Sequence, residues 1–179
     1  MNVANLLDLA GGEAVSEFRR QKLLDALAGR EPGISNLAAR FCHLVELARP
    51  LNERERALLE RLLSYGPRTE GAAAGEAFAL VVPRPGTQSP WSSKASDIAH
   101  NCGLDAVLRI ERGVRWWITG EVSDRLAVEA LLHDRMTEAV LAADADVGIL
   151  FRHTPPAPLA RVTLGDDGVA ALTAANQRL

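Results

Sequence analysis

The stretch that decides the fold is residues 77–104, AFALVVPRPGTQSPWSSKASDIAHNCGL. It begins with Ala77–Val82, an uninterrupted apolar run that is typical of a strand buried on both faces. After a turn containing proline and glycine, Ser89 and Pro90 form a typical helix start, because serine caps the first turn and proline suits the first helical position. Gly103 stands where a left-handed residue would end that helix. The stretch therefore predicts a strand, a polar loop and a helix in succession.

The expected helix has one apolar face, formed by side chains at helical spacing: Trp91, Ala95, Ile98, Ala99 and Cys102. We expect this face to pack in the core, with Cys102 as a small buried hydrophobe.

The loop and the helix start form a candidate functional segment. A strand that leads through a polar loop to a helix N-terminus is a common way to present groups to an anion, but Ser92-Ser93-Lys94 lacks the glycine spacing of a P-loop. Three interpretations stay open: a well-capped helix start, a docking face for another domain, and direct contact with a substrate or nucleotide. The candidate docking residues are Arg84, Thr87, Ser89, Trp91, Ser92, Ser93 and Lys94.

A similar order of elements precedes this stretch. Val3–Leu9 predicts a strand that Gly11 and Gly12 close, and Ser16 predicts the cap of a helix. Ile34–Leu47 predicts either one long strand or a hairpin, and Asn52 predicts the cap of a second helix.

The order recurs after residue 104. Ala106–Ile110 and Val114–Glu121 predict two strands around a turn at Glu111–Gly113, with Gly113 supplying a positive φ. Trp116 and Trp117 must face opposite sides of their strand, so we expect one in the core and the other exposed unless something covers it. A long helix is expected from Ser123 to Leu141.

The order strand, helix, strands, helix thus occurs twice at a spacing of about 75 residues. We predict an α+β fold of two tandem ferredoxin-like units, in a domain at 1–153 with halves at about 1–68 and 76–153. Residues 154–179 are expected to be the truncated start of a linker region. Around it, Val147–His153 and Val162–Leu164 predict strands, and Asp166–Leu179 predicts a helix that the end of the chain interrupts.

Composition excludes several classes of function. The 179 residues carry 20 basic and 23 acidic side chains, and no basic patch indicates nucleic-acid binding. No apolar stretch reaches the length of a membrane helix, and the opening residues lack the charged flank of a signal peptide. With only Cys42 and Cys102, the chain is expected to be a cytoplasmic protein with reduced thiols and no membrane partner.

The chain offers no catalytic or metal-binding constellation. His100 and Cys102 do not face each other on a helix, so a nucleophilic pair is not expected. The four histidines lie on separate elements without metal-ligand spacing, His133 included, and there is no CxxC. We therefore expect no catalytic residue, no cofactor-binding residue and no metal in this chain.

Several segments, in order, carry a resemblance to a known family. They are Phe18-Arg19, Lys22–Leu24, Pro50–Asn52, Leu59–Leu63, Tyr65–Pro67, Arg84–Leu104, Arg109–Gly113, His133–Glu138, Ala174–Asn176 and Arg178-Leu179. Together they resemble the N-terminal region of phosphoribosylformylglycinamidine synthase, the large single-chain FGAR amidotransferase of purine biosynthesis.

The resemblance implies both a fold and a role. In this family the region is a tandem of two ferredoxin-like units, similar to a dimer of the small separate subunit of split enzymes, and it packs beside the synthetase core. The full-length enzyme is a ligase that uses ATP, Mg²⁺ and glutamine to convert FGAR to FGAM, and its catalytic cysteine lies in a glutaminase domain that follows this region.

We therefore expect this chain to be a structural docking domain that is inactive alone, with the synthetase and glutaminase domains of the same polypeptide as its partners. The alternative is a free-standing ferredoxin-like binding module that partners a separate enzyme. A small enzyme that uses His100 or His133 lacks partner residues at usable spacing.

Overall fold

The computed structural model describes residues 5–66, 76–152, 158–159, 161–165 and 167–177. Its strands are β1 (Leu6–Glu13), β2 (Ile34–Leu47), β3 (Ala79–Pro83), β4 (Val107–Gly120) and β5 (Glu138–Leu141). Its helices are α1 (Glu17–Ala28), α2 (Glu53–Leu62), α3 (Pro90–Asn101), α4 (Arg125–Leu132) and α5 (Gly168–Asn176), with a 3-10 helix η2 at Val147–Phe151. The chain is thus a mixed α+β protein, as its pattern predicts.

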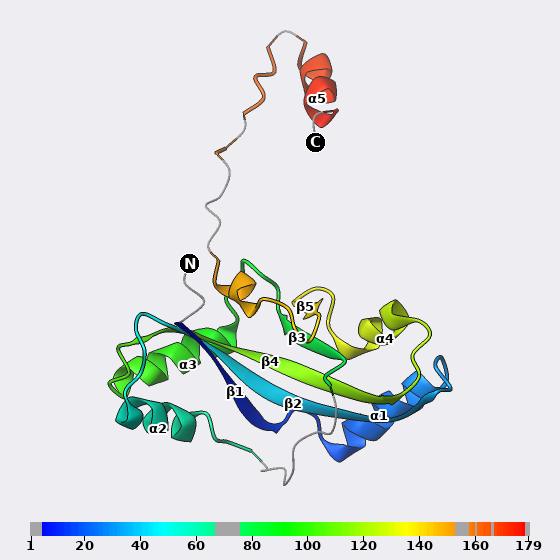
Figure 1. The fold of residues 1–179 in the computed structure, drawn as a ribbon. Helices are drawn as coiled ribbons and strands as arrows, with labels where there is room; N and C mark the ends of the chain where they lie inside the picture. The colour runs from blue at the N-terminus through cyan, green and yellow to red at the C-terminus, as the bar shows by residue number, and fades with distance from the viewer. Residues whose placement is uncertain (1–4, 67–75, 153–157, 160, 166, 178–179) are drawn as a thin grey trace.

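The five strands form one antiparallel sheet in the order β1-β2-β4-β3-β5. Its centre is the pair β2 and β4, which run side by side from Ile34 opposite Gly120 to Leu47 opposite Val107 (Figure 1). Ile34–Leu47 is therefore one strand, which decides between the two alternatives that the sequence left open. The predicted repeat appears as β1-α1-β2-α2 followed by β3-α3-β4-α4, but the two halves share this one sheet.

The four helices α1 to α4 cover one face of the sheet, in two pairs. Side chains alternate along a strand, and the β2 residues Leu37 and Val45 share a face, although they belong to different apolar clusters. Leu37 packs with α1 and α4, whereas Val45 packs with α2 and α3. Figure 1 shows these two helix pairs at opposite ends of the sheet.

The helix pairs mix the two halves of the chain. Helix α1 of the first half contacts α4 of the second, and α2 of the first half shares a cluster with α3 of the second. The loops between the first helix and the second strand of each half cross over in the same way. Glu31 accepts hydrogen bonds from the start of α4, and Ala106 accepts one from Ala48 just before α2.

The opposite face of the sheet carries a third apolar cluster. Cys42 and Leu44 of β2 pack there with Leu80, Leu150 and Phe151, the last two from η2. Val147–His153 was predicted to be a strand. Instead Asp146 caps η2 by accepting a hydrogen bond from the backbone N–H of Gly148, and the 3-10 turn places Leu150 and Phe151 on the sheet.

The predicted turn at Glu111–Gly113 is also wrong, because β4 runs straight through it. Gly113 does not have a positive φ. A Cβ atom there would lie 3.0 Å from the Val81 carbonyl oxygen and 3.1 Å from the Cys42 sulfur, so this glycine permits close approach of neighbouring strands. Glu111 remains inside the sheet because its carboxylate has hydrogen-bond donors, described below.

The predicted long helix from Ser123 to Leu141 is a short helix and a strand. Asp124, one residue after Ser123, caps α4, which ends at Leu132. Thr137 and Glu138 donate backbone hydrogen bonds to the Asp134 carbonyl oxygen, and the chain then pairs with β3 as β5.

Two smaller predictions are wrong, and the predicted helix caps are correct. Strand β1 continues through Gly11 instead of closing there, and Arg161–Gly165, which includes the strand expected at Val162–Leu164, has no regular secondary structure. The caps predicted at Ser16, Asn52 and Ser89 are confirmed.

Candidate functional site

The loop that joins β3 to α3 is an ordered turn. The backbone N–H of Thr87 donates to the Arg84 carbonyl oxygen at 3.1 Å, and the Thr87 hydroxyl donates to the same oxygen at 2.6 Å. Gly86 has a φ of 84°, which glycine adopts without steric cost. The loop also reaches its neighbour in space, because the Arg84 N–H donates to the Thr137 carbonyl oxygen at 3.1 Å.

A fully buried carboxylate on β4 fixes this loop through hydrogen bonds. Glu111 accepts hydrogen bonds from the backbone N–H of Ser89 at 3.3 Å and from the Ser89 hydroxyl at 2.9 Å. Arg109 pairs with Glu111 and donates to the carbonyl oxygens of Thr87 and Leu150. One ion pair therefore joins the sheet, the loop and η2, and this explains how a charged residue is accommodated inside β4.

Helix α3 begins as its sequence predicts. The Ser89 hydroxyl oxygen accepts a hydrogen bond from the Ser92 backbone N–H at 3.0 Å, and Pro90 occupies the first turn. At the other end Gly103 has a φ of 83°, which confirms the left-handed residue expected there.

The loop, the start of α3 and the segment before β5 enclose a shallow hollow of about 520 Å³, which we call the loop hollow. Its lining includes Arg84, Thr87, Ser89 and Met136, of which Met136 is 79% exposed. The rest of the lining is formed by Pro83, Gln88, Pro90, Thr137 and Glu138.

The helix face predicted to enter the core is partly correct, because Ala99 is buried and Trp91 and Ala95 pack against the cluster between α2 and α3. The buried residues of α3 are Ser92, Ser96 and Ala99, whereas Ile98 is 53% exposed and Cys102 is exposed. Small serines lie on the sheet because the Ser96 hydroxyl oxygen accepts a hydrogen bond from the buried Ile110 N–H at 3.0 Å.

The structure divides the seven candidate docking residues into separate places. Arg84, Thr87 and Ser89 line the loop hollow, and Ser93 is exposed beside it on α3. Ser92 is fully buried and presents no surface. Trp91 and Lys94 are not part of the lining of the hollow and instead line a second depression, between α2 and α3.

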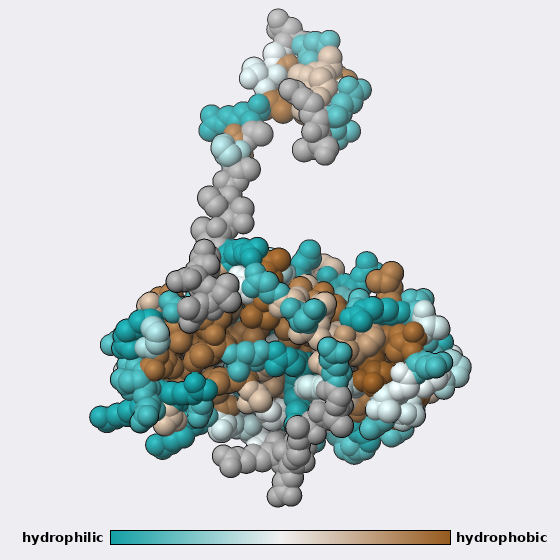
Figure 2. Space-filling model, viewed as in Figure 1, coloured by the Kyte–Doolittle hydropathy of each residue, from teal (hydrophilic) through white to brown (hydrophobic). Residues whose placement is uncertain are grey.

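This second depression, the α2/α3 groove, has a volume of about 360 Å³ and is mostly apolar. Leu59 and Leu62 form one wall, Trp91 and Ile98 the other, and Tyr65 and Lys94 lie at its margins. Hydrophobic side chains reach the surface at this end of the body, near α3 (Figure 2). Sequence reasoning did not predict the groove, because the two helices that form it come from different halves of the chain.

A cluster of aromatic and basic side chains adjoins the groove. The His43 ring stacks on Trp91 at 5.7 Å, and its Nε2 atom is 2.8 Å from the Tyr65 hydroxyl. The Arg112 guanidinium lies over the rings of Phe41 and Trp91 and donates to the Tyr65 hydroxyl oxygen at 3.3 Å. Burial, followed by the positive charge of Arg112, lowers the pKa of His43 to about 4, so the ring is neutral at pH 7.

The two cysteines lie in different environments, and the one predicted to be buried, Cys102, is the exposed one. Cys42 is buried and its pKa is raised to about 11, chiefly by desolvation, so the thiol is not ionised at neutral pH. Cys102, expected in the core, is exposed at the end of α3.

The two histidines considered for catalysis form hydrogen bonds with backbone carbonyl oxygens. His100 Nε2 donates to the Val107 carbonyl oxygen at 2.6 Å, and His133 Nδ1 donates to the Glu129 carbonyl oxygen at 2.5 Å. Within the described ranges of the chain, no group of three or more His, Cys, Asp or Glu side chains could hold a metal ion.

Residues 40–151, from β2 to the end of η2, match the sequence model of the formylglycinamide ribonucleotide amidotransferase N-terminal family. The chain belongs to this family. The match contains the residues that line the loop hollow and the α2/α3 groove, and the Arg109–Glu111 pair. It assigns the chain to the N-terminal domain of a purine-biosynthesis amidotransferase. No helix in the part of the chain that the structure describes is long and apolar enough to cross a membrane.

Proposed function

We propose that this chain is a non-catalytic docking domain of the FGAR amidotransferase, and that its partners are the synthetase and glutaminase domains of the same polypeptide. The family match supports this role, since an N-terminal domain of a larger enzyme requires partner domains. We also propose that each half of the sheet is a ferredoxin-like unit, that the protein acts in the cytoplasm, and that residues 154–179 begin a linker region.

The observation that carries the docking proposal is the way in which Glu111 and Arg109 hold the β3–α3 loop. Loops that bind another surface need a fixed geometry, because ordering a flexible loop on binding lowers affinity. Here the Ser89 and Thr87 backbone groups are tied to a buried ion pair, while Arg84 and Thr87 remain exposed at the rim of the loop hollow. The loop is therefore preorganised and accessible.

The complete enzyme is proposed to use ATP, Mg²⁺ and glutamine to convert FGAR to FGAM. None of these chemical roles falls on this chain in our proposal. Its contribution is to pack on the synthetase domain and to help shape the site and the path taken by ammonia.

A complementation assay tests the proposal. The chain is mixed with the same enzyme lacking residues 1–179, and ATP- and glutamine-dependent FGAM formation is measured. We expect turnover only in the mixture. Activity of the shortened enzyme alone would contradict the docking role.

A matched pair of variants then locates the contact. Arg84→Glu places a negative charge at the loop hollow, and Arg54→Glu makes the same change on the exposed surface of α2. We expect a lower apparent affinity for the shortened enzyme with Arg84→Glu only. Equal affinities for the two variants would place the contact elsewhere.

A further inference from the structure

The α2/α3 groove exposes apolar side chains between its two helices. Helices α1 and α4 contact each other at their end of the sheet and bury Leu27, Val128 and Leu132 there. Between α2 and α3, in contrast, Ile98 is 53% exposed and Tyr65 is 39% exposed. The groove thus leaves apolar surface uncovered between α2 and α3.

Helix α5 is rich in apolar residues but packs none of them in a core. None of its residues is buried, and Val169 and Leu172 are 78% and 54% exposed. These two residues are three apart and therefore lie on one face of the helix. Removing such side chains from water is favourable, so α5 gains stability from contact with an apolar surface within reach.

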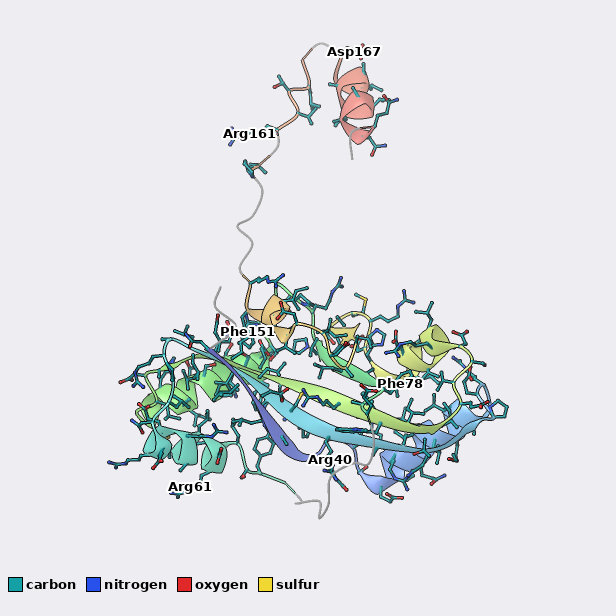
Figure 3. All side chains as sticks on the ribbon, in the orientation of Figure 1. Arg40, Arg61, Phe78, Phe151, Arg161 and Asp167 are labelled. Carbon is teal, nitrogen blue, oxygen red and sulfur yellow. The ribbon has the colours of Figure 1, made fainter. Side chains whose placement is uncertain are left out.

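The connection is long enough for α5 to reach the groove. Phe151 is fixed on the sheet and Asp167 precedes α5, and Figure 3 labels both ends of this connection. The sixteen residues 152–167 can span at most about 53–58 Å when fully extended. Their starting point lies next to α3, because Arg109 donates hydrogen bonds both to Leu150 in η2 and to Thr87 before α3.

The charges are complementary as well. Asp167 is the cap of α5 and carries a negative charge at the end where the helix begins. Lys94 lines the groove, and Arg112 lies over Trp91 in its wall. Neither cation forms an ion pair with a carboxylate among the residues that the structure describes.

We propose that α5 docks into the α2/α3 groove of its own chain, with Val169 and Leu172 against Trp91 and Ile98 and its acidic end toward Lys94. Because the contact lies within one chain, it does not depend on the docking function proposed above.

Isoleucine methyl resonances test this proposal in the full chain. Ile98 and Ile110 line the groove, whereas Ile34 and Ile118 pack near the other helix pair. Leu172→Asp introduces a charge on the docking face of α5, and Leu159→Asp makes the same change in the connection, at a residue that is 80% exposed. We expect Leu172→Asp to shift the methyl signals of Ile98 and Ile110 only, and Leu159→Asp to shift neither.

A spin label gives a second readout that does not require α5 to be disrupted. It is attached at Gln177→Cys, at the end of α5, in a chain whose exposed Cys102 is replaced by serine. Docking predicts broadening of the Ile98 and Ile110 signals and no broadening at Ile34 or Ile118.

Two results would overturn the proposal. One is the absence of selective broadening at Ile98 and Ile110. The other is broadening that appears when spin-labelled chains without isotope are mixed with isotope-labelled chains, because the occupant would then be a second copy.

Discussion

At the scale of single residues, two polar side chains on the central strands are fully buried, and both connect the sheet to loops. Glu111 on β4 receives the hydrogen bonds of Ser89 and Arg109. His43 on β2 binds Tyr65 at the end of α2 and stacks on Trp91 of α3. Replacing either residue is therefore expected to change the free energy of unfolding by an amount that depends on the partners it loses.

Replacing Glu111 by alanine is expected to lower the free energy of unfolding by about 3 kcal/mol, because it leaves Arg109 and the Ser89 N–H without their acceptor. Arg109 is itself only 20% exposed, so water replaces the lost carboxylate poorly. The measurement is urea unfolding at pH 7.

The matched control is Glu60→Ala, which removes the carboxylate of the exposed Arg56–Glu60 pair on α2. Exposed pairs of this spacing are worth about 0.3–0.5 kcal/mol, so the change should be small. Similar losses in the two variants would show that Glu111 has no special role.

The buried His43 makes stability depend on pH. Its pKa is about 4 in the folded protein and about 6.5 in an unfolded chain, so the unfolded state binds more protons between these values. The free energy of unfolding is therefore expected to be complete above about pH 6.5 and to fall by up to about 3 kcal/mol as the pH decreases toward 4. Urea unfolding at a series of pH values measures this slope.

His43→Gln removes the titrating group and keeps a polar side chain at the same position. Its slope between pH 7 and pH 5 should be flatter than that of the original chain. An unchanged slope would mean that other groups cause the dependence.

At the scale of elements, α4 depends on a residue far away in sequence. Glu31, in the loop between α1 and β2, is 4% exposed and accepts hydrogen bonds from the Ser123 N–H, the Ser123 hydroxyl and the Asp124 N–H. These bonds lower the pKa of Glu31. They also provide acceptors for backbone N–H groups at the start of α4, which have no partner within the helix.

Glu31→Ala is therefore expected to loosen α4 more than any other helix. Hydrogen exchange should become faster at the amides of residues 125–132, while the amides of α2 keep their rates. Glu121→Ala, a change of the same kind at an exposed residue nearby, should leave the exchange of α4 unaltered. Equal effects of both changes would show that Glu31 does not hold the helix.

At the scale of the whole molecule, the two halves are interleaved. The central strand pair, both helix pairs and the crossing loops each combine one partner from each half. A half on its own would therefore expose the hydrogen-bonding edge of β2 or β4 together with the apolar surface that the other half covers.

Separate chains of residues 1–68 and 76–153 are thus expected not to fold as monomers, and to form native structure when they are mixed. Circular dichroism and size-exclusion chromatography of each half and of the mixture measure this. A monomeric half with native helix and strand content would contradict the interleaved arrangement.

Local signals in the sequence determined the elements whose boundaries depend on a few neighbouring residues. Ser16, Asn52 and Ser89 cap their helices as predicted, since each cap needs only a side-chain oxygen and the N–H groups of the next turn. The repeated order of elements and the family resemblance were also readable from the sequence, and the family match confirms the latter.

The sites depended on contacts that sequence patterns do not encode. Glu111 was predicted to lie in a turn because Gly113 could supply a positive φ, and only the approach of Ser89 and Arg109 makes the burial of Glu111 in the strand favourable. The buried face of α3 was misassigned in part, because Ser96 accepts a hydrogen bond from the Ile110 N–H while Trp91 and Ile98 line the groove beside α2.

The sequence by itself thus determined the α+β class and the start of α3, because these follow from local order and composition, and its motifs carried the resemblance to the family. The tertiary structure alone decided that the halves form one sheet, that the docking candidates face two different depressions, and that α2 and α3 leave a groove. These features arise where residues from distant parts of the chain meet, and the hydrogen bonds and apolar contacts that stabilise them exist only after folding.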